Sequence, residues 1–432
     1  MKRIGIDIGT TTICGAVVDV ENKSFIESVT RPNGTFIETE NPWEKIQNPK
    51  EIIKTAKAIV DELIDRHPDT VSIGVSGQMH GIVYVDCEGQ PVSNLYIWQD
   101  GRGELKYDND KSYASYIKDV TGYKVATGFG LVTHFYNMKN SLVPESARKL
   151  CTIHDLFAMT LCGRNTPVMH TSDAASLGLF DLEKLGFDKA AIGALGIDTD
   201  VLPEVERDFK FIGEYRSIPV CTAIGDNQAS FLGSLSHEDD SLLVNVGTGS
   251  QISLMCDGYR KTEGAVELRP LFGNKYLLVG SSLSGGRAYA MLESFFREVA
   301  NMTGAGVDSM YKYMDSLAKE CDEECTLCVS TLFDGTREDP SKRGSITNIG
   351  ISNFTPFQMM LGFCRGISHE LFEMYSQMNV PMKNKIIGSG NGIRKNDLLR
   401  KAVLSDFGLM PEIPHYKEEA SCGAAISSSM AM

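Results

Sequence analysis

Residues 4–19 read IGIDIGTTTICGAVVD, and residues 242–255 read LLVNVGTGSQISLM. In each stretch, two apolar runs flank a polar corner of glycine and threonine, which predicts a strand, a tight turn and a second strand. A shift of 238 positions (247 − 9) places Gly9 on Gly247 and makes the threonines that follow them coincide. A repeat separated by half the chain predicts a duplication that gives two lobes of similar topology.

Helices and strands are expected to alternate after each hairpin. Residues 49–66 place their apolar side chains on one helical face, and Asn48 is a suitable cap for that helix. Residues 71–76, VSIGVS, predict a buried strand, and a second long helix is expected from Thr355 to about Met378. The alternation predicts an α/β fold in both halves.

A polar, charged joint, LSHEDD at residues 235–240, precedes the second hairpin. We place the domain boundary there, with a first domain at residues 1–236 and a second at residues 237–432. Residues 418–426, EEASCGAAI, are rich in small side chains and predict a tightly packed terminal helix.

Composition excludes several classes of function. The 42 Lys and Arg residues against 56 Asp and Glu give a formal charge of −14, so a nucleic-acid partner is not expected. No run of about 18 apolar residues exists, and Asp7 interrupts the first apolar run, so neither a membrane span nor a secretory signal is predicted. Eleven scattered cysteines suit a reducing compartment, and we expect a cytoplasmic protein.

The two glycine–threonine corners are candidate phosphate loops. Backbone N–H groups can approach a phosphate closely beside glycine, and hydroxyl groups add donors. Asp7, just before the first corner, is suited to hold a magnesium ion. An ordinary hairpin turn is the alternative for each corner. The candidate nucleotide-binding residues here are Gly9, Thr10, Thr11, Thr12, Gly247 and Thr248.

Two nearby stretches combine polar and apolar side chains in a way that suits a polyhydroxy ligand. Residues 76–86, SGQMHGIVYVD, predict a strand end, a polar corner and another strand, and residues 96–102, YIWQDGR, add an aromatic and two charged side chains. The candidate substrate contacts are Gln78, Met79, His80, Trp98, Asp100 and Arg102. The alternatives are a structural histidine, a core tryptophan and an ordinary surface ion pair between the last two residues.

Asp226 is a candidate general base, because its carboxylate lies at the mouth of an apolar segment in residues 223–233, AIGDNQASFLG. Capping of the helix that follows is the alternative, and the two roles are compatible. Gly285 and Gly286 in residues 279–290, and Gly390 in residues 386–399, are candidates for contact with a nucleoside. Loop glycines without a ligand remain the alternative there.

The order of these motifs resembles that of the FGGY carbohydrate kinases across essentially the whole chain. The motifs are DIGTTT at 7–12, GQMHG at 77–81, WQDGR at 98–102, GDNQA at 225–229, VGTGS at 246–250 and GSGNG at 388–392. Other stretches look most like the subgroup that acts on the seven-carbon ketose sedoheptulose. These stretches are ATGFG at 126–130, TIHDLFAMTLCG at 152–163, SDAAS at 172–176 and SGGRA at 284–288.

The resemblance implies a two-lobed, actin-like ATPase fold with an RNase H-like core, in which each lobe is a mixed sheet flanked by helices. It implies ATP and Mg²⁺ as cofactors, with Asp226 as the base and with Asp7 and Asp226 near the metal. It adds Asn227 to the sugar contacts and Asn391 to the adenosine region. A ketose would be phosphorylated on its terminal primary hydroxyl, and a homodimer is possible.

Two alternatives remain open at this point. Gly249 and Asn227 make the chain look slightly like xylulokinases, which act on a pentulose. An actin-like ATPase that clamps a protein partner would share the fold and the phosphate loops, but such a protein has no use for the predicted sugar contacts.

Overall fold

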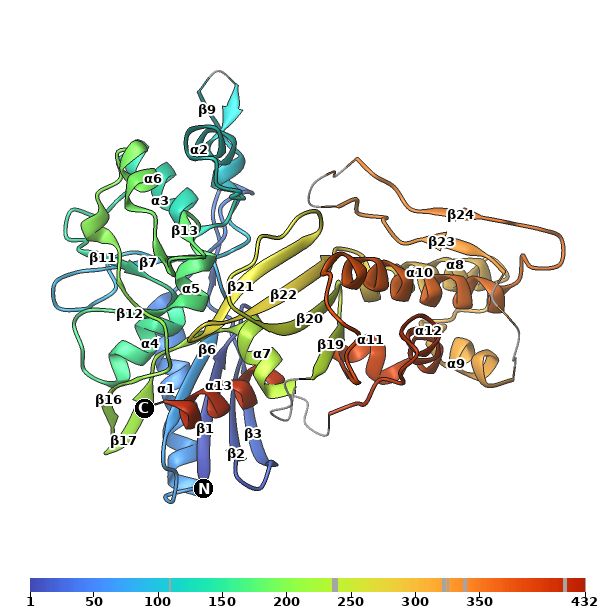
Figure 1. Cartoon of the computed structure of the whole chain (residues 1–432), viewed down its shortest axis with the longest axis horizontal. Coiled ribbons are helices and arrows are strands. Elements are labelled where there is room, and N and C mark those ends of the chain that lie inside the picture. The colour runs from blue at the N-terminus through green and yellow to red at the C-terminus, as the bar shows by residue number, and fades with distance from the viewer. Residues whose placement is uncertain are drawn as a thin grey trace.

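The computed structural model describes residues 1–432 except 109, 235–239, 321–323, 325, 337, 338, 340, 415–417 and 432. Figure 1 shows two lobes that lie side by side. The predicted domain boundary after residue 236 falls outside the described residues and stays a prediction.

The first lobe is built on a seven-stranded sheet with the order β16-β17-β6-β1-β2-β3, in which β18 also pairs with β6. Its strands are β1 (Lys2–Ile8), β2 (Thr12–Asp19), β3 (Ser24–Pro32), β6 (Ile73–Gly77), β16 (Phe211–Tyr215), β17 (Ile218–Cys221) and β18 (Ile224–Gly225). The first predicted hairpin is confirmed, because β1 and β2 are antiparallel with Ile8 opposite Ile13. Alternate residues of β1 point to the core, where Ile4, Ile6 and Ile8 are fully buried.

The second lobe repeats this plan with a five-stranded sheet of order β21-β22-β20-β19-β25. Its strands are β19 (Ser241–Val246), β20 (Ser250–Asp257), β21 (Val266–Phe272), β22 (Lys275–Ser282) and β25 (Lys385–Ser389). In the first lobe β1 pairs antiparallel with β2 and parallel with β6, and in the second lobe β19 pairs the same way with β20 and β25.

The repeat extends to a hydrogen bond at the end of each leading strand. Ser76 donates its hydroxyl to Oδ1 of Asp7 at 3.1 Å. At the matching place in the second lobe, Asn245 donates its amide to Oγ of Ser389 at 2.7 Å. The predicted duplication is therefore confirmed in topology and in local detail.

Helices cover both sheets. The predicted helix at 49–66 is confirmed as α1 (Pro49–Arg66), with the Asn48 side chain accepting from two backbone N–H groups. The other helices of the first lobe are α2 (Tyr113–Thr121), α3 (Gly130–Lys139), α4 (Ile153–Leu161), α5 (Thr171–Ser176), α6 (Lys189–Ala194) and α7 (Asp226–Ser234). The second lobe has α8 (Gly285–Asn301), α9 (Tyr311–Glu320), α10 (Pro356–Gln377), α11 (Gly390–Lys395) and α12 (Asp397–Phe407).

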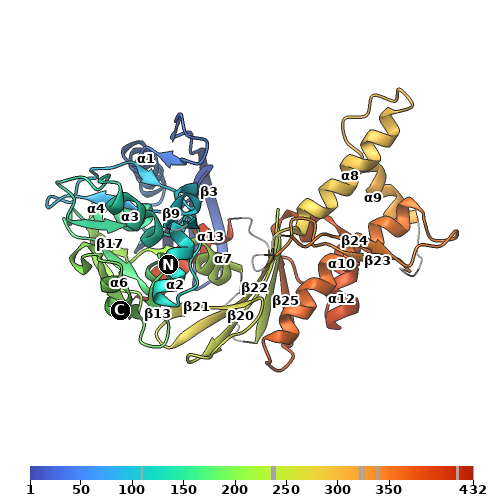
Figure 2. The same cartoon turned by 90° about the horizontal axis from the view of Figure 1, so that it is seen from above.

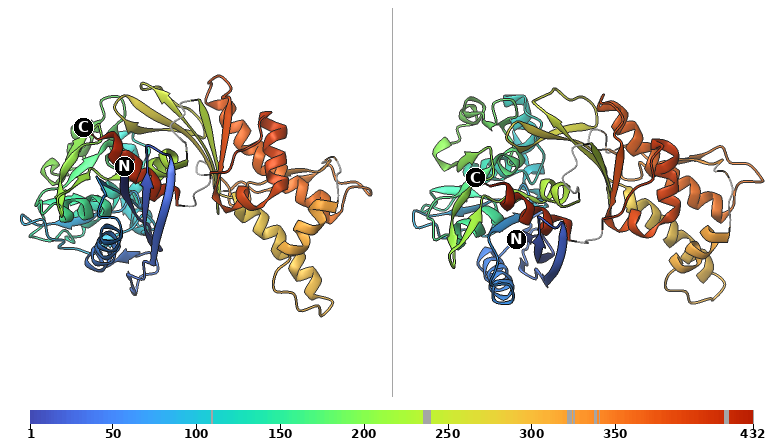
Figure 3. Two further views of the ribbon diagram at one scale, coloured as in Figure 1. Left: turned by 90° about the horizontal axis from the view of Figure 1, so that it is seen from below. Right: turned by 60° about the horizontal axis from the view of Figure 1, so that its bottom comes forward.

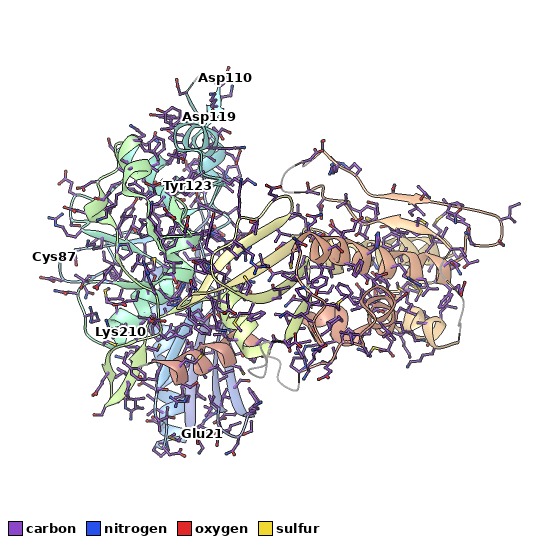
Figure 4. All side chains as sticks on the ribbon, in the orientation of Figure 1. Glu21, Cys87, Asp110, Asp119, Tyr123 and Lys210 are labelled. Carbon is purple, nitrogen blue, oxygen red and sulfur yellow. The ribbon has the colours of Figure 1, made fainter. Side chains whose placement is uncertain are left out.

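Shorter elements complete the lobes. They are β4 (Phe36–Ile37), β5 (Ile46–Gln47), β7 (Val83–Val85), β8 (Leu95–Tyr96), β9 (Lys106–Asp108), β10 (Lys111–Ser112), β11 (Lys149–Cys151), β12 (Val168–His170), β13 (Phe180–Asp181), β14 (Gly186–Phe187), β15 (Glu204–Glu206), β23 (Cys328–Ser330), β24 (Ser345–Thr347) and two 3₁₀ turns at Gly101–Glu104 and Thr199–Val201. Asp110 and Asp119 lie at the tip near β9, far from both sheets (Figure 4). Helices α10 and α12 lie on the side of the second sheet that faces away from the first lobe (Figure 2). Among the described residues, no helix combines the length and the apolar character needed to cross a bilayer.

The terminal helix α13 (Glu419–Met430) returns to the first lobe and packs on α7, β1 and β6 (Figure 3). Ser421 donates its hydroxyl to the backbone oxygen of Cys14 at 3.1 Å, and the hydroxyls of Ser428 and Ser72 are 2.8 Å apart. The sequence predicts a tightly packed helix here, and the helix is confirmed. Its residues fall in the second predicted domain, yet they pack in the first lobe.

We expect Gly423→Ala to destabilise the protein by about 3 kcal/mol, because a Cβ at this position would overlap the main-chain oxygen of Ala229 in α7. Urea unfolding at neutral pH measures the loss. Gly193→Ala is the matched control, since Gly193 is also helical but has open space around it. We expect the free energy of unfolding of the control variant to rise by a few tenths of a kcal/mol to about 1 kcal/mol, because alanine has a higher helix propensity than glycine. Equal stability of the two variants would contradict the predicted packing.

Candidate active site

The turn between β1 and β2 lies in a hydrogen-bond network that includes two of the predicted sugar contacts. Thr10 donates its hydroxyl to Oε1 of Gln78 at 3.1 Å, and Trp98 donates its indole N–H to Oγ1 of Thr10 at 3.1 Å. Gln47 donates to the backbone oxygen of Thr10 at 2.9 Å and accepts from Gln78 at 2.9 Å. The first candidate phosphate loop and the candidate sugar residues therefore meet at one place.

Asn33 braces the same turn from the end of β3. Its side chain donates to the backbone oxygen of Gly9 at 2.8 Å, and its backbone N–H donates to the oxygen of Thr11 at 2.8 Å. These two hydrogen bonds use backbone oxygens of the turn, and the Thr11 and Thr12 side chains are exposed. Sequence reasoning missed Asn33 and Gln47, because neither residue belongs to a motif.

Two partly buried carboxylates, Asp7 and Asp226, interact at this end of the sheet. Burial, and after it the negative charge of Asp226, raises the pKa of Asp7 to about 7. Burial raises the pKa of Asp226 to about 6, while His154 acts in the opposite direction. A divalent cation between such carboxylates would relieve both effects, and carboxylate oxygens are ligands that Mg²⁺ prefers. The donor set therefore fits magnesium.

A fully buried cluster of His154, Asp155 and Asp173 lies beneath these carboxylates. Nε2 of His154 is 2.9 Å from Oδ1 of Asp173, and Asp155 accepts from the hydroxyl of Thr152 at 2.6 Å. Burial lowers the pKa of His154, raises that of Asp173 well above its usual range and raises that of Asp155 to about 7. One ligand atom from each residue lies within 4.8 Å of the others, a spacing compatible with a metal ion. Residues 152–163 and 172–176 belong to the stretches that resemble the family, but their sequence predicts no such cluster.

Met79 and His80 form the corner after β6. Met79 is 8% exposed, and its Sδ and Cε atoms pack on Gly225, just before Asp226. His80 adopts φ +72°, its backbone N–H donates to Oγ of Ser176 at 3.1 Å, and its ring stacks on Phe129 at 4.5 Å. These contacts fix the His80 ring against Phe129 and the end of α5.

The two charged residues of the WQDGR motif are internal. Asp100 and Arg102 are 0% and 1% exposed, and they form an ion pair at 2.6 Å. Arg102 also donates to Asn137 at 2.5 Å and lies over the Tyr96 ring. The surface ion pair considered from the sequence is therefore wrong. Because their polar atoms bond within the protein, a supporting role suits both residues better than the predicted direct sugar contact.

Trp98 is 47% exposed, so the alternative of a core tryptophan is also wrong. Asp100 accepts from the backbone N–H of Lys45 at 2.9 Å and from that of Arg102 at 3.1 Å. The buried ion pair thus anchors the loop that presents the exposed indole face.

The second candidate phosphate loop, residues 247–249, meets the start of α8. Gly286 and Arg287 donate their backbone N–H groups at 2.9 Å to the oxygens of Gly247 and Thr248, respectively. Gly285 is so close to Gly249 that a Cβ there would overlap its main chain. The start of α8 therefore sets the shape of this loop.

Helix α11 begins against the same loop. Gly390 has φ +82° and lies close to the backbone oxygen of Val246, while Asn391 is exposed. Three glycine stretches that are distant in sequence, at residues 247, 285 and 390, are thus brought together by the second sheet.

The start of α7 is bonded to the second lobe at two successive residues. Arg269 of β21 donates Nη1 to Oδ1 of Asn227 at 2.9 Å. Gln228 donates its amide to the backbone oxygen of Pro270 at 3.1 Å. Helix α7 therefore connects the lobe that carries Asp226 with the sheet of the other lobe. Sequence reasoning missed Arg269, because it belongs to none of the motifs and shares its strand with a second charged residue, Glu267.

The two lobes share one duplicated plan, and the leading strand of each lobe ends at a glycine turn. A carboxylate lies at the start of the helix between the two sheets. These features define an actin-like ATPase fold. The known relatives agree. The description "FGGY family of carbohydrate kinases, N-terminal domain" matches residues 3–233. The chain belongs to the FGGY family of carbohydrate kinases, and it is an ATP-dependent carbohydrate kinase.

Similar proteins extend this assignment to the whole chain. A sedoheptulokinase of Mus musculus is 28% identical, with coverage of 98% of this chain and 96% of the relative. A sedoheptulokinase of Homo sapiens is 27% identical with the same coverage. The crystal structure of ligand-bound xylulose kinase from Lactobacillus acidophilus matches with a TM-score of 0.82 at 20% identity, over 99% of this chain and 88% of that one.

Proposed function

We propose that the protein transfers the γ-phosphoryl group of ATP to the terminal primary hydroxyl of a ketose, and that the ketose is sedoheptulose. The observation that carries this proposal is the convergence of Thr10, Gln78, Trp98 and the Asp7–Asp226 carboxylate pair at one end of the first sheet. The sedoheptulokinases of mouse and human supply the choice of sugar.

In the proposed reaction, Asp226 orients the primary hydroxyl and accepts its proton as the oxygen attacks the γ-phosphorus atom. A pKa of about 6 keeps this carboxylate ionised at neutral pH, so that it can take the proton. Asp7 and Asp226 would hold Mg²⁺, which supplies charge neutralisation on the transferring group. The nucleotide would contact Gly9, Thr10, Thr11, Thr12, Gly247, Thr248, Gly285, Gly286, Gly390 and Asn391.

The sugar would lie against Gln78, Met79, His80, Trp98 and Asn227. A polyhydroxy ligand needs hydrogen-bond partners on its edges and an apolar surface for its C–H groups. The half-exposed Trp98 indole offers that apolar surface, and the Asn227 amide, whose oxygen accepts from Arg269, offers its nitrogen as a donor. Asp100 and Arg102 support the Trp98 loop from beneath. A homodimer and a cytoplasmic location stay predictions.

A pentulose is the second candidate substrate. The fold matches a xylulose kinase over nearly the full chain, and the residues after the catalytic aspartate and in the second loop look like those of xylulokinases. Sedoheptulose and xylulose share the reactive end but differ in length, so the contacts to the distant hydroxyls decide between them.

A panel of sugars tests this choice. We expect kcat/KM for sedoheptulose to exceed that for xylulose and ribulose by at least about tenfold, because one or two extra hydroxyl contacts contribute at about this level. ADP release measured with each sugar at saturating Mg·ATP gives the ratios. A higher value for xylulose would replace the heptulose with the pentulose. ATP hydrolysis that no sugar stimulates would favour an ATPase that clamps a protein partner.

A further inference from the structure

Arg269 is a charged residue of the second lobe that contacts the start of α7. Glu267, two positions earlier and therefore on the same face of β21, accepts from Nε and Nη2 of Arg269 at 3.1 and 2.6 Å. The remaining nitrogen, Nη1, donates to Oδ1 of Asn227 at 2.9 Å. The Arg269 side chain is only 20% exposed, so this planar fork is held on both sides.

This contact determines which way the Asn227 amide faces. A guanidinium group only donates hydrogen bonds, so the atom of Asn227 that meets it must be the carbonyl oxygen. The amide nitrogen of Asn227 then points the other way with two hydrogens to donate. A neutral amide without such a partner can rotate by 180° and exchange its donor and its acceptor.

We infer that Arg269 is a positioning residue for the sugar site: it holds the Asn227 amide so that the nitrogen donates to a hydroxyl oxygen of the ketose. The inference rests on the proposed function, in which Asn227 contacts the sugar. Its consequence is that the sugar site of the first lobe is completed by a side chain of the second lobe. A sugar that lacks an acceptor oxygen at this place loses the same interaction.

The contact between α7 and β21 does not depend on Arg269 alone. Gln228 donates to the backbone oxygen of Pro270 at 3.1 Å, and the side chain of residue 269 plays no part in that bond. Arg269→Met keeps most of the aliphatic stem and this neighbouring bond. The variant therefore removes the orientation of the amide and leaves the helix attached to the strand.

Steady-state kinetics of the full-length enzyme test the inference. We expect Arg269→Met to raise the KM for the ketose about tenfold, because a charge-assisted hydrogen bond is lost on the partner of the sugar. The KM for ATP stays within about twofold. Arg269→Lys keeps one donor and restores part of the loss. A general structural defect would change both KM values and the melting temperature. A raised KM for the ketose with an unchanged KM for ATP therefore identifies Arg269 as a positioning residue.

A double-mutant cycle separates action through Asn227 from direct contact with the sugar. If Arg269 acts through Asn227, the double variant Arg269→Met with Asn227→Ala has the same ketose KM as Asn227→Ala alone. If the increases in ketose KM of the two single variants multiply in the double variant, the inference is wrong, because Arg269 would then contact the sugar itself. Arg66→Met is the matched control, since Arg66 also forms ion pairs with glutamate but is 50% exposed at the far end of α1.

The failure of the inference and the failure of the proposed function give different results. An active enzyme whose ketose KM is unchanged in Arg269→Met overturns the inference and leaves the kinase assignment intact. An unmodified chain that phosphorylates no ketose overturns the proposed function, and the inference falls with it.

Discussion

Asp226→Asn abolishes phosphoryl transfer and at the same time makes the protein more stable. We expect kcat to fall by about 10³-fold, because an amide cannot accept the proton of the sugar hydroxyl. The stability gain follows from the pKa of Asp226, which burial raises from 3.8 to about 6. Above pH 6 the folded protein must therefore hold an ionised carboxylate in an unfavourable place, which costs about 1–3 kcal/mol.

The gain in stability from Asp226→Asn increases as pH rises. Between about pH 4 and 6 the folded state binds more protons at the Asp226 carboxyl group than the unfolded state. The contribution of Asp226 therefore lowers the free energy of unfolding of the unmodified protein as pH rises. The advantage of Asp226→Asn is consequently full at pH 8 and small at pH 4.5. Urea unfolding at both pH values, with EDTA present, measures it.

Asp69→Asn is the matched control for Asp226→Asn. Asp69 is an exposed carboxylate paired with Lys2 at 3.0 Å, and its substitution changes neither kcat nor stability by more than a few tenths of a kcal/mol. Normal turnover by Asp226→Asn would remove the residue from its role as the base. Loss of turnover together with a lower stability at pH 8 would contradict the burial argument and leave the role in catalysis untouched.

Gly286→Ala disrupts the nucleotide site without affecting the sugar site. The backbone N–H of Gly286 donates to Gly247, and a Cβ at residue 286 would overlap the same carbonyl oxygen. The second phosphate loop must then move away from α8. We expect kcat/KM for ATP to fall about 100-fold, because displacement of a positioning loop by about 1 Å costs roughly this factor.

Calorimetry with the ketose alone provides the internal check for Gly286→Ala, since the changed contact with Gly247 involves none of Gln78, Trp98 and Asn227. We expect the ketose Kd to stay within about twofold. Gly34→Ala is the control, because Gly34 has open space around it. We expect this variant to keep the kcat/KM for ATP and the ketose Kd of the unmodified protein. An unchanged KM for ATP in Gly286→Ala would mean that the loop at 247–249 does not hold the nucleotide.

The elements that the sequence predicts well are those set by local patterns. The paired hairpins, helix α1 with its Asn48 cap and the duplicated topology all follow from apolar periodicity and turn residues within short windows. The same holds for α13, whose small residues indicate close packing. Which lobe it packs against depends on contacts between residues about 400 positions apart, and no local pattern encodes those.

The candidate site divides in the same way. Thr10, Gln78 and Trp98 lie in motifs and were predicted, and the structure brings them together. Gln47 and Arg269 act through hydrogen bonds to residues that are distant in sequence, so their neighbours in sequence carry no signal. The pairing of Asp100 with Arg102 could be expected from their spacing, but their burial depends on Tyr96 and Asn137, which other elements supply.

The position of α13 has a consequence for the order in which the chain is made and folded. Protein synthesis delivers β1 and β6 long before α13, the helix that packs on both strands. Until then, the small-residue faces of β1 and α7 remain uncovered in the nascent chain. The first lobe therefore completes its packing only after the strands and helices of the second lobe have been synthesised.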